Sequence, residues 1–287
     1  RRDSGFRAWL PIMYGCDNFC TYCIVPYVRG RERSREPAAI LAEFKQLVAQ
    51  GYKEITLLGQ NVNSYGKGLE NPIDFADLLN LLCEVPGDYQ IRFMTSHPKD
   101  ASRKLIDTIA AQEHLCKHIH LPVQSGSDSV LKAMNRRGDK AELLALFREL
   151  RARIPNLVLR TSLITGLPFE DEAAFEEMCE FLQEVRIERA GVFPYSPEEG
   201  TPAARMLNRV DTAEAERRAE LVVDVQSRIM DDFNDSRMGT VAEVLCDGFD
   251  QEAMQFVGRS YAESPDIDGR IYFTADHLSL IHISEPT

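Results

Sequence analysis

Three cysteines lie within eight residues near the start of this chain, at Cys16, Cys20 and Cys23. Their C-x₃-C-x₂-C spacing allows three thiolates to reach one iron-sulfur cube while its fourth iron keeps no protein ligand. Such an open iron can bind a substrate or a cofactor. The loop that carries the cysteines is opened by Gly15 and followed by Pro26. The spacing therefore predicts a [4Fe-4S] cluster with one open iron.

A structural zinc site is the main alternative, because three cysteines and a distant histidine can hold this ion. Zinc-binding cysteines usually occur as two C-x₂-C pairs, and the sequence contains no second pair. A disulfide is disfavoured, because three thiols are an odd number and the other cysteines stand apart in the chain. A non-catalytic zinc or RNA-binding module therefore stays open as a function of a different class. The remaining cysteines are Cys83, Cys116, Cys179 and Cys246.

Length and composition predict a soluble, intracellular protein with a large α/β domain and a smaller unit. Reduced cysteines and an oxygen-sensitive cluster then imply the reducing cytoplasm. We expect neither a membrane span, which needs ~20 apolar residues, nor a signal peptide. The formal net charge of −12 is unevenly distributed. Residues 1–137 carry 18 Lys and Arg against 15 Asp and Glu, whereas residues 138–287 carry 15 against 30. The first half thus suits contact with nucleic acid, and the second half suits it only if its acids point away.

Six strand-like apolar runs alternate with amphipathic helical stretches. This alternation predicts parallel βα units that curl into a partial (β/α)₆ barrel, followed by a helix and a small β-barrel. The expected strands of the barrel are 8–13, 54–58, 90–94, 118–121, 157–163 and 190–193. The expected helices are 36–50, 74–84, 101–113, 126–134, 139–153, 170–186 and 211–237. Short strands are expected at 241–245, 256–258 and 270–274.

Polar residues and glycines follow the predicted strands, at the end where parallel barrels carry their chemistry. Any one of these residues could simply punctuate a loop. Five such turns at one rim, together with the cysteines, instead predict a pocket for a cofactor with scattered polar groups. The turn residues are Gln60, Ser96, Gln124, Ser162 and Gly166.

Several motifs of the first half resemble the methylthiotransferase family of radical S-adenosylmethionine (radical SAM) enzymes. They are most similar to the branch that installs a 2-methylthio group on isopentenyl-adenosine beside the anticodon of tRNA. The motifs are YGCDNFCTYCIVPYVRG at 14–30, LGQNVN at 58–63, TSHP at 95–98 and HLPVQSGSD at 120–128.

The second half is more similar to the branch that methylthiolates an aspartate of a small-subunit ribosomal protein. The similarity changes near residues 134–138, where the charge also changes sign. A natural hybrid and a junction of two paralogous sequences both stay open. Phe169 departs from the family, which usually has glycine there. The motifs are LRTSLITGLP at 159–168, GVFPYSPEEGTP at 191–202 and GRSYAESPDIDG at 258–269.

The resemblance implies a cluster bound by the three cysteines and an S-adenosylmethionine (SAM) molecule chelated to the open iron. An external electron donor would reduce the cluster, and SAM cleavage would give a 5′-deoxyadenosyl radical. A further [4Fe-4S] cluster, the sulfur source of the family, is expected in an amino-terminal domain that these residues lack. The chain alone is therefore expected to cleave SAM without methylthiolating a substrate. The SAM-binding candidates are Tyr22, Gln60, Ser96, Gln124, Ser162 and Gly166.

The substrate is predicted to be tRNA, with the ribosomal protein as the alternative. Four arginines that follow the cysteines could contact phosphates, although such a run can also be a solvated turn. Residues 239–277 carry eight acidic and two basic residues, which suits a basic protein better than RNA. The expected units are a radical SAM core over 1–210, a connecting helix over 211–238, a small barrel over 239–277 and a non-native tail over 278–287. The arginines are Arg29, Arg31, Arg33 and Arg35.

Overall fold

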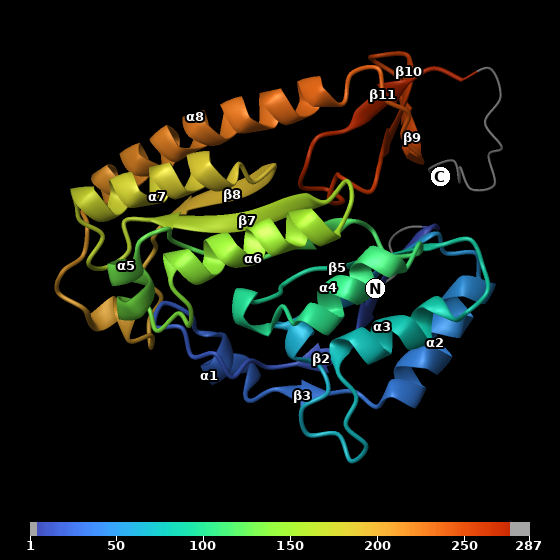
Figure 1. Ribbon diagram of the computed structural model, residues 1–287, viewed down its shortest axis with the longest axis horizontal. Helices are drawn as coiled ribbons and strands as arrows, with labels where there is room; N and C mark the ends of the chain where they lie inside the picture. The colour runs from blue at the N-terminus through green and yellow to red at the C-terminus, as the bar shows by residue number, and fades with distance from the viewer. Residues whose placement is uncertain (1–4, 276–287) are drawn as a thin grey trace.

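The structure, a computed structural model, describes residues 5–275 and shows parallel strands covered by helices (Figure 1). The predicted α/β class is confirmed. The core strands are β1 (Arg7–Pro11), β4 (Glu54–Leu58), β5 (Gln90–Phe93), β6 (His118–His120), β7 (Val158–Thr165) and β8 (Arg189–Pro194). The helices between them are α1 (Val25–Arg29), α2 (Pro37–Ala49), α3 (Phe75–Cys83), α4 (Arg103–Ala111), α5 (Asp128–Ala133), α6 (Lys140–Arg153) and α7 (Glu172–Val185). Two short strands, β2 (Met13–Tyr14) and β3 (Arg33–Ser34), and three 3₁₀ turns complete this part.

The six core strands form two parallel sheets of three strands each, in the orders β1-β4-β5 and β6-β7-β8. Between β5 and β6 the described residues form no ladder, and a single parallel bridge joins Ile91 to Leu115. The core is therefore an open, partial barrel made of two half-sheets. Its strands run in chain order, so their carboxyl ends meet at one rim.

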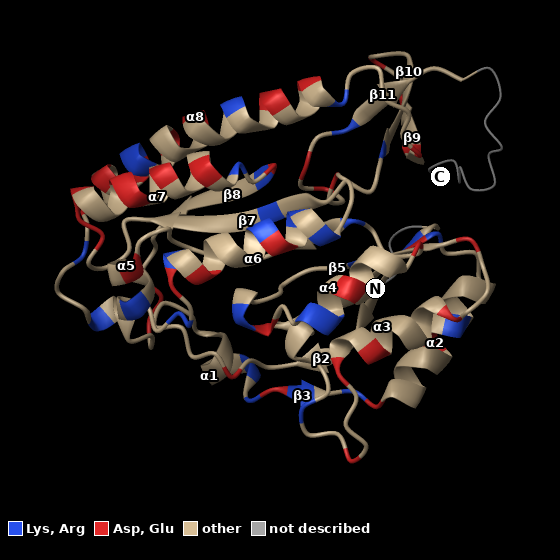
Figure 2. Cartoon of the chain, in the orientation of Figure 1, with Lys and Arg blue, Asp and Glu red and all other residues tan. Residues whose placement is uncertain are grey.

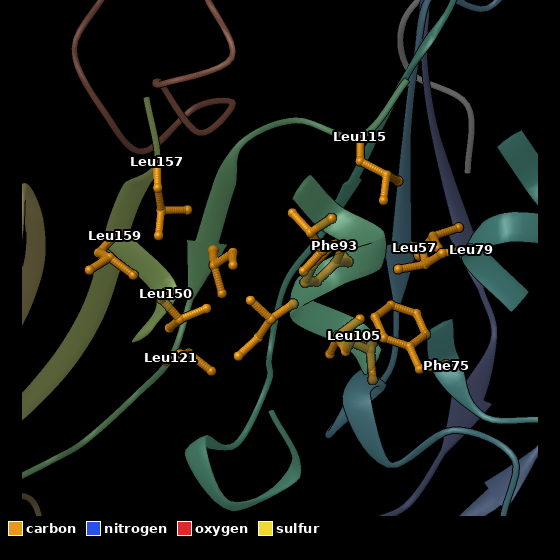
Figure 3. Close-up of a cluster of buried hydrophobic side chains, with 14 of the residues drawn as sticks. Leu57, Phe75, Leu79, Phe93, Leu105, Leu115, Leu121, Leu150, Leu157 and Leu159 are labelled. Atoms are coloured by element: carbon orange, nitrogen blue, oxygen red, sulfur yellow. The ribbon is translucent and has the colours of Figure 1, made fainter. Parts of the chain in front are cut away.

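Apolar side chains fill the space between the two half-sheets and their helices (Figure 3). Leu57 and Phe93 come from one half-sheet and Leu159 from the other, and Leu105 of α4 belongs to the same cluster. All four are at most 5% exposed. Burying each such side chain stabilises the fold by roughly 1.5–3 kcal/mol, so the core holds the half-sheets together without a continuous ladder.

Helix α8 (Thr212–Ser236) packs along α7 and β8 and leads to the carboxyl-terminal sheet. That sheet contains β9 (Leu245–Asp250), β10 (Gln255–Arg259) and β11 (Ile271–Phe273), paired antiparallel in the order β11-β10-β9. Within residues 5–275 these three strands form an open sheet rather than the expected small barrel. The strand expected at 241–245 begins only at Leu245, where pairing with β10 starts, and Val241 is fully exposed.

Two further expectations concern the carboxyl-terminal tail and membrane-spanning helices. The tail predicted at 278–287 lies outside the described residues. No described helix has the length and apolar character needed to cross a membrane.

Candidate cofactor site

The cysteine loop leaves the core between β2 and β3, which pair at its neck. The Cys16 amide donates to the carbonyl of Gly30 at 3.1 Å, and the Gly15 amide donates to Gln60 Oε1 at 2.6 Å. Gly15 has φ +78°, and a Cβ there would lie 2.1 Å from the carbonyl oxygen of Arg31. Only glycine fits this position, so the neck fixes where the loop begins.

All three cysteines of the loop line one cavity of about 170 Å³. Gln60, Ser96 and Gln124, which follow β4, β5 and β6, also line it. The cysteine loop and the polar turns predicted after three strands thus surround one cavity. Phe19, Asn61, Thr95, His97, Pro122 and Arg136 complete most of the wall.

Ser96, in the same wall, has a buried hydroxyl that a bound ligand could satisfy. It is 7% exposed, and its Oγ has no hydrogen-bond partner among the described residues. A buried hydroxyl without a partner costs on the order of 1–3 kcal/mol, which a polar group in the cavity would offset.

Three non-glycine residues of the same wall have left-handed backbone conformations. Phe19, Thr95 and Gln124 have φ values of 48°, 63° and 75°. For a β-branched residue such as Thr95 this conformation is an outlier that costs on the order of 1–3 kcal/mol. Such strain is concentrated at binding and catalytic sites, and here three instances surround one cavity.

A second cavity of about 310 Å³ shares Tyr22 and Gln124 with the first. Ser162 and Ile164 of β7 and Tyr195 after β8 line it, and the Tyr195 hydroxyl is buried with no partner among the described residues. Together the two cavities offer room for an elongated ligand with polar groups along its length.

Gly166 lies outside both cavities, although the sequence placed it among the cofactor residues. Its amide donates to Glu170 Oε1 at 2.7 Å, and a Cβ there would lie 2.3 Å from the Ala215 Cβ of α8. In the structure, Gly166 thus packs against helix α8 and does not line the cofactor cavities.

Arg136 was missed by the sequence-based prediction. Its Nη1 donates to Cys20 Sγ at 3.6 Å, and its Nη2 donates to the carbonyl of Pro122. The segment that carries it docks on the cysteine loop, because the Thr21 amide donates to the carbonyl of Met134 at 3.0 Å. Two adjacent arginines after a short helix were the only signal in the sequence.

The four arginines after the loop have different surroundings. Arg29 and Arg33 are exposed, and Arg31 is exposed while pairing with Asp17 at 3.0 Å. Arg35 instead pairs with Glu43 at 2.8 Å and donates to the carbonyl of Pro11. Arg29 and Arg33 thus remain available at the surface, whereas Arg31 is held by Asp17 and Arg35 supports the fold.

The donor set fits an iron-sulfur cluster. Burial raises the pKa of Cys16 and Cys23, and bound iron would deprotonate such thiols outright. The Arg136 donor on Cys20 is of the kind that tunes cluster potentials. His97 also lines the cavity, but within residues 5–275 no group of three His, Cys, Asp or Glu side chains is placed to hold a single metal ion.

Comparison with known families gives two matches. The model of the Radical SAM superfamily matches residues 10–182, which include the cysteine loop and both cavities up to β7. The model of the TRAM domain matches residues 238–281, which include the carboxyl-terminal sheet.

Two similar proteins carry the same name. The tRNA-2-methylthio-N(6)-dimethylallyladenosine synthase of Alkaliphilus oremlandii is 52% identical over 247 residues, which are 86% of this chain and 52% of that protein. The synthase of the same name from Desulfitobacterium hafniense is 49% identical over 242 residues, 84% of this chain and 54% of that protein. The chain therefore spans about half the length of these relatives, and the similarity extends through both of its halves.

Solved structures support the fold alone. Coproporphyrinogen III oxidase (HemN) from Escherichia coli has a TM-score of 0.58 at 16% identity, covering 80% of this chain and 54% of that chain. The radical S-adenosylmethionine methyltransferase TsrM from Kitasatospora setae, with cobalamin and a [4Fe-4S] cluster bound, also has a TM-score of 0.58 at 16% identity. It covers 71% of this chain and 39% of that chain.

Proposed function

This chain belongs to the radical SAM superfamily, and we propose that it is the catalytic core of a tRNA methylthiotransferase acting on isopentenyl-adenosine. The observation that carries the proposal is the pair of cavities that share Tyr22 and Gln124. One is lined by the three thiols, and each is lined by a buried hydroxyl that has no partner in the part of the chain the structure describes. The relatives that share about half of its residues bear the name of this activity.

Cys16, Cys20 and Cys23 would hold a [4Fe-4S] cluster in the first cavity. When bound, the cluster supplies the electron that cleaves SAM. Ser96 and Gln124 would orient the amino-acid end of SAM beside it, and Ser162 and Tyr195 would bind polar groups in the second cavity. Tyr22, which lines both cavities, would lie between the two ends of the SAM molecule. Arg136 would hold Cys20 in place and keep a positive charge beside the cluster.

The complete enzyme is proposed to contain more than this chain, because its relatives are about twice as long. An auxiliary [4Fe-4S] cluster in the rest of the protein would supply the sulfur, and an external donor would supply electrons. Within the chain we propose a core over 1–210, a connecting helix over 211–238 and a substrate-binding unit over 239–277.

The charges of the carboxyl-terminal unit weaken the case for a ribosomal protein as the substrate. Three of its acids are used inside the molecule, because Asp247, Glu263 and Asp268 pair with arginines. Much of the remaining acidic surplus of the second half lies on α7 and α8 (Figure 2). The exposed arginines that follow the cysteine loop instead suit the phosphates of tRNA.

The test is the salt dependence of binding to isopentenylated tRNA. Each phosphate contact adds about 0.7 to 0.9 to the slope of log affinity against log salt. We expect the double variant Arg29→Gln/Arg33→Gln to lower that slope by about 1.5. Arg148→Gln is the matched control, because Arg148 lies on α6 and pairs with Glu184 at 2.7 Å. Salt-independent binding, or tighter binding of the ribosomal protein than of tRNA, would overturn the proposed substrate.

A further inference from the structure

Five successive core strands each carry a buried polar side chain within their first three residues. This end of the barrel is opposite the cavities, and polar groups in such a place need partners to offset their lost hydration. None of the five side chains is more than 8% exposed. The residues are Glu54 of β4, Arg92 of β5, His118 of β6, Arg160 of β7 and Arg189 of β8.

One stretch of the carboxyl-terminal unit, the 259–268 segment, provides a partner for each of them. On the first half-sheet, Arg259 pairs with Glu54 at 3.1 Å, and Arg92 donates to the carbonyls of Ser260 and Tyr261, both at 2.8 Å.

The same segment continues across the second half-sheet. There Arg189 pairs with Glu263 at 3.2 Å, Ser264 Oγ lies 3.4 Å from His118 Nε2, and Arg160 pairs with Asp268 at 3.5 Å. The half-sheets share no ladder of hydrogen bonds among the described residues, so the 259–268 segment bridges them through side chains.

A chain of polar contacts runs from this segment to the second cavity. Arg160, which pairs with Asp268, lies with Nη1 3.0 Å from His120 Nδ1, and His120 Nε2 lies 3.4 Å from Ser162 Oγ. Because arginine can only donate, Nδ1 accepts and the neutral ring carries its proton on Nε2. His120 then donates to Ser162, which leaves the Ser162 hydroxyl hydrogen for a ligand in the cavity.

We propose that the 259–268 segment is a clamp that joins the two half-sheets and, through Arg160 and His120, sets the position of Ser162 in the SAM site. Asp268 is a positioning residue in this arrangement, because it acts through other side chains. The inference rests on the proposed function for the identity of the ligand, and it extends that function to the carboxyl-terminal unit. Contact of that unit with substrate would thereby act on the cofactor site.

Asp268→Asn tests the clamp in the chain without cofactors. It removes the charge with little change of shape, and we expect backbone amides of β6 and β7 to exchange about tenfold faster. Asp266→Asn is the matched control, because Asp266 lies in the same segment, is 67% exposed and pairs with Arg7 at the surface. Asp268→Glu should restore slow exchange. If Asp268→Asn does not fold, Ser264→Ala removes a single contact to His118 and should act in the same direction.

A second measurement connects the clamp to the site. In the reconstituted chain, Asp268→Asn should raise the dissociation constant of SAM about tenfold, and Asp266→Asn should leave it unchanged. Unchanged exchange in β6 and β7 in both Asp268→Asn and Ser264→Ala would overturn the clamp. Faster exchange with unchanged SAM affinity would overturn the link to Ser162. If the wild-type chain fails to bind SAM, the proposed function fails while the exchange result still decides the clamp.

Discussion

The three cysteines of the loop differ from the other cysteines in their surroundings. The three loop thiols face one cavity, whereas Cys83 lies on α3 and Cys246 on β9, away from both cavities. Burial raises the pKa of Cys83 to about 11 against the opposing effect of Lys117, as expected of a thiol packed among apolar groups.

Anaerobic reconstitution should therefore load one [4Fe-4S] cluster per chain, and replacing any loop cysteine by alanine should reduce iron to near background. Three thiolates are the minimum protein ligand set for a cube with an open iron, so each loss removes the site. Iron analysis and visible absorption measure this. Cys83→Ala and Cys246→Ala are the controls. Equal iron loss in loop variants and controls would refute the assignment.

The sequence predicted side chains that lie at or after the ends of predicted strands, and it missed those placed by long-range packing. Gln60, Ser96, Gln124 and Ser162 line the cavities because strand ends in a parallel fold converge. Arg136 meets Cys20 across 116 positions of sequence, through docking of the segment after α5. Periodicity and spacing carry no information on such a contact.

Among the elements, the connection from β7 to α7 contains a residue, Phe169, whose side chain does not suit its backbone conformation. Phe169 has φ 69°, a left-handed conformation that favours glycine, and its amide donates to the carbonyl of Asn208 at 2.9 Å. Its side chain is 45% exposed, so little packing compensates the strain. The departure noted in the sequence thus falls at a position where the backbone itself favours glycine.

Phe169→Gly should raise the free energy of unfolding by about 0.5 to 1 kcal/mol. Removing Cβ relieves roughly 1–2 kcal/mol of left-handed strain, and the greater freedom of glycine in the unfolded chain offsets part of it. Urea denaturation measures the change. Phe169→Ala keeps Cβ and should give no gain, so an equal effect of both variants would locate the cause in the lost ring.

Strands and helices of the core were predicted closely, because each has a strong period and clear ends. Helix α6, for example, begins after Asp139, whose side chain forms a reciprocal capping box with Glu142. The β9 strand was placed too early, since its position depends on pairing with β10 rather than on its own pattern. The gap between β5 and β6 was likewise not predictable from local sequence.

At the scale of the whole molecule, the interior of the barrel is unusually polar near the clamp. His118 and His120 are 4% and 7% exposed and lie among arginines. Arg92, Arg160 and Arg189 face His118, together with Ser264, whereas Arg160, Asp268 and Ser162 face His120. Burial lowers the pKa of His118 well below its usual value and that of His120 to about 4, with nearby arginines adding to both shifts.

These two histidines should make the fold sensitive to mild acid. Their pKa values, like that of the buried His97, which burial lowers to about 2, are lower in the folded than in the unfolded chain, so between pH 6 and 5 the unfolded state binds between two and three more protons. The free energy of unfolding should therefore fall by roughly 3 to 4 kcal/mol per pH unit in this window, and be fully recovered above pH ~7. Urea denaturation of the chain without cofactors at pH 7, 6 and 5 measures it. His120→Gln should lower the slope by about a third, and a slope that the variant leaves unchanged would show that other groups cause the acid sensitivity.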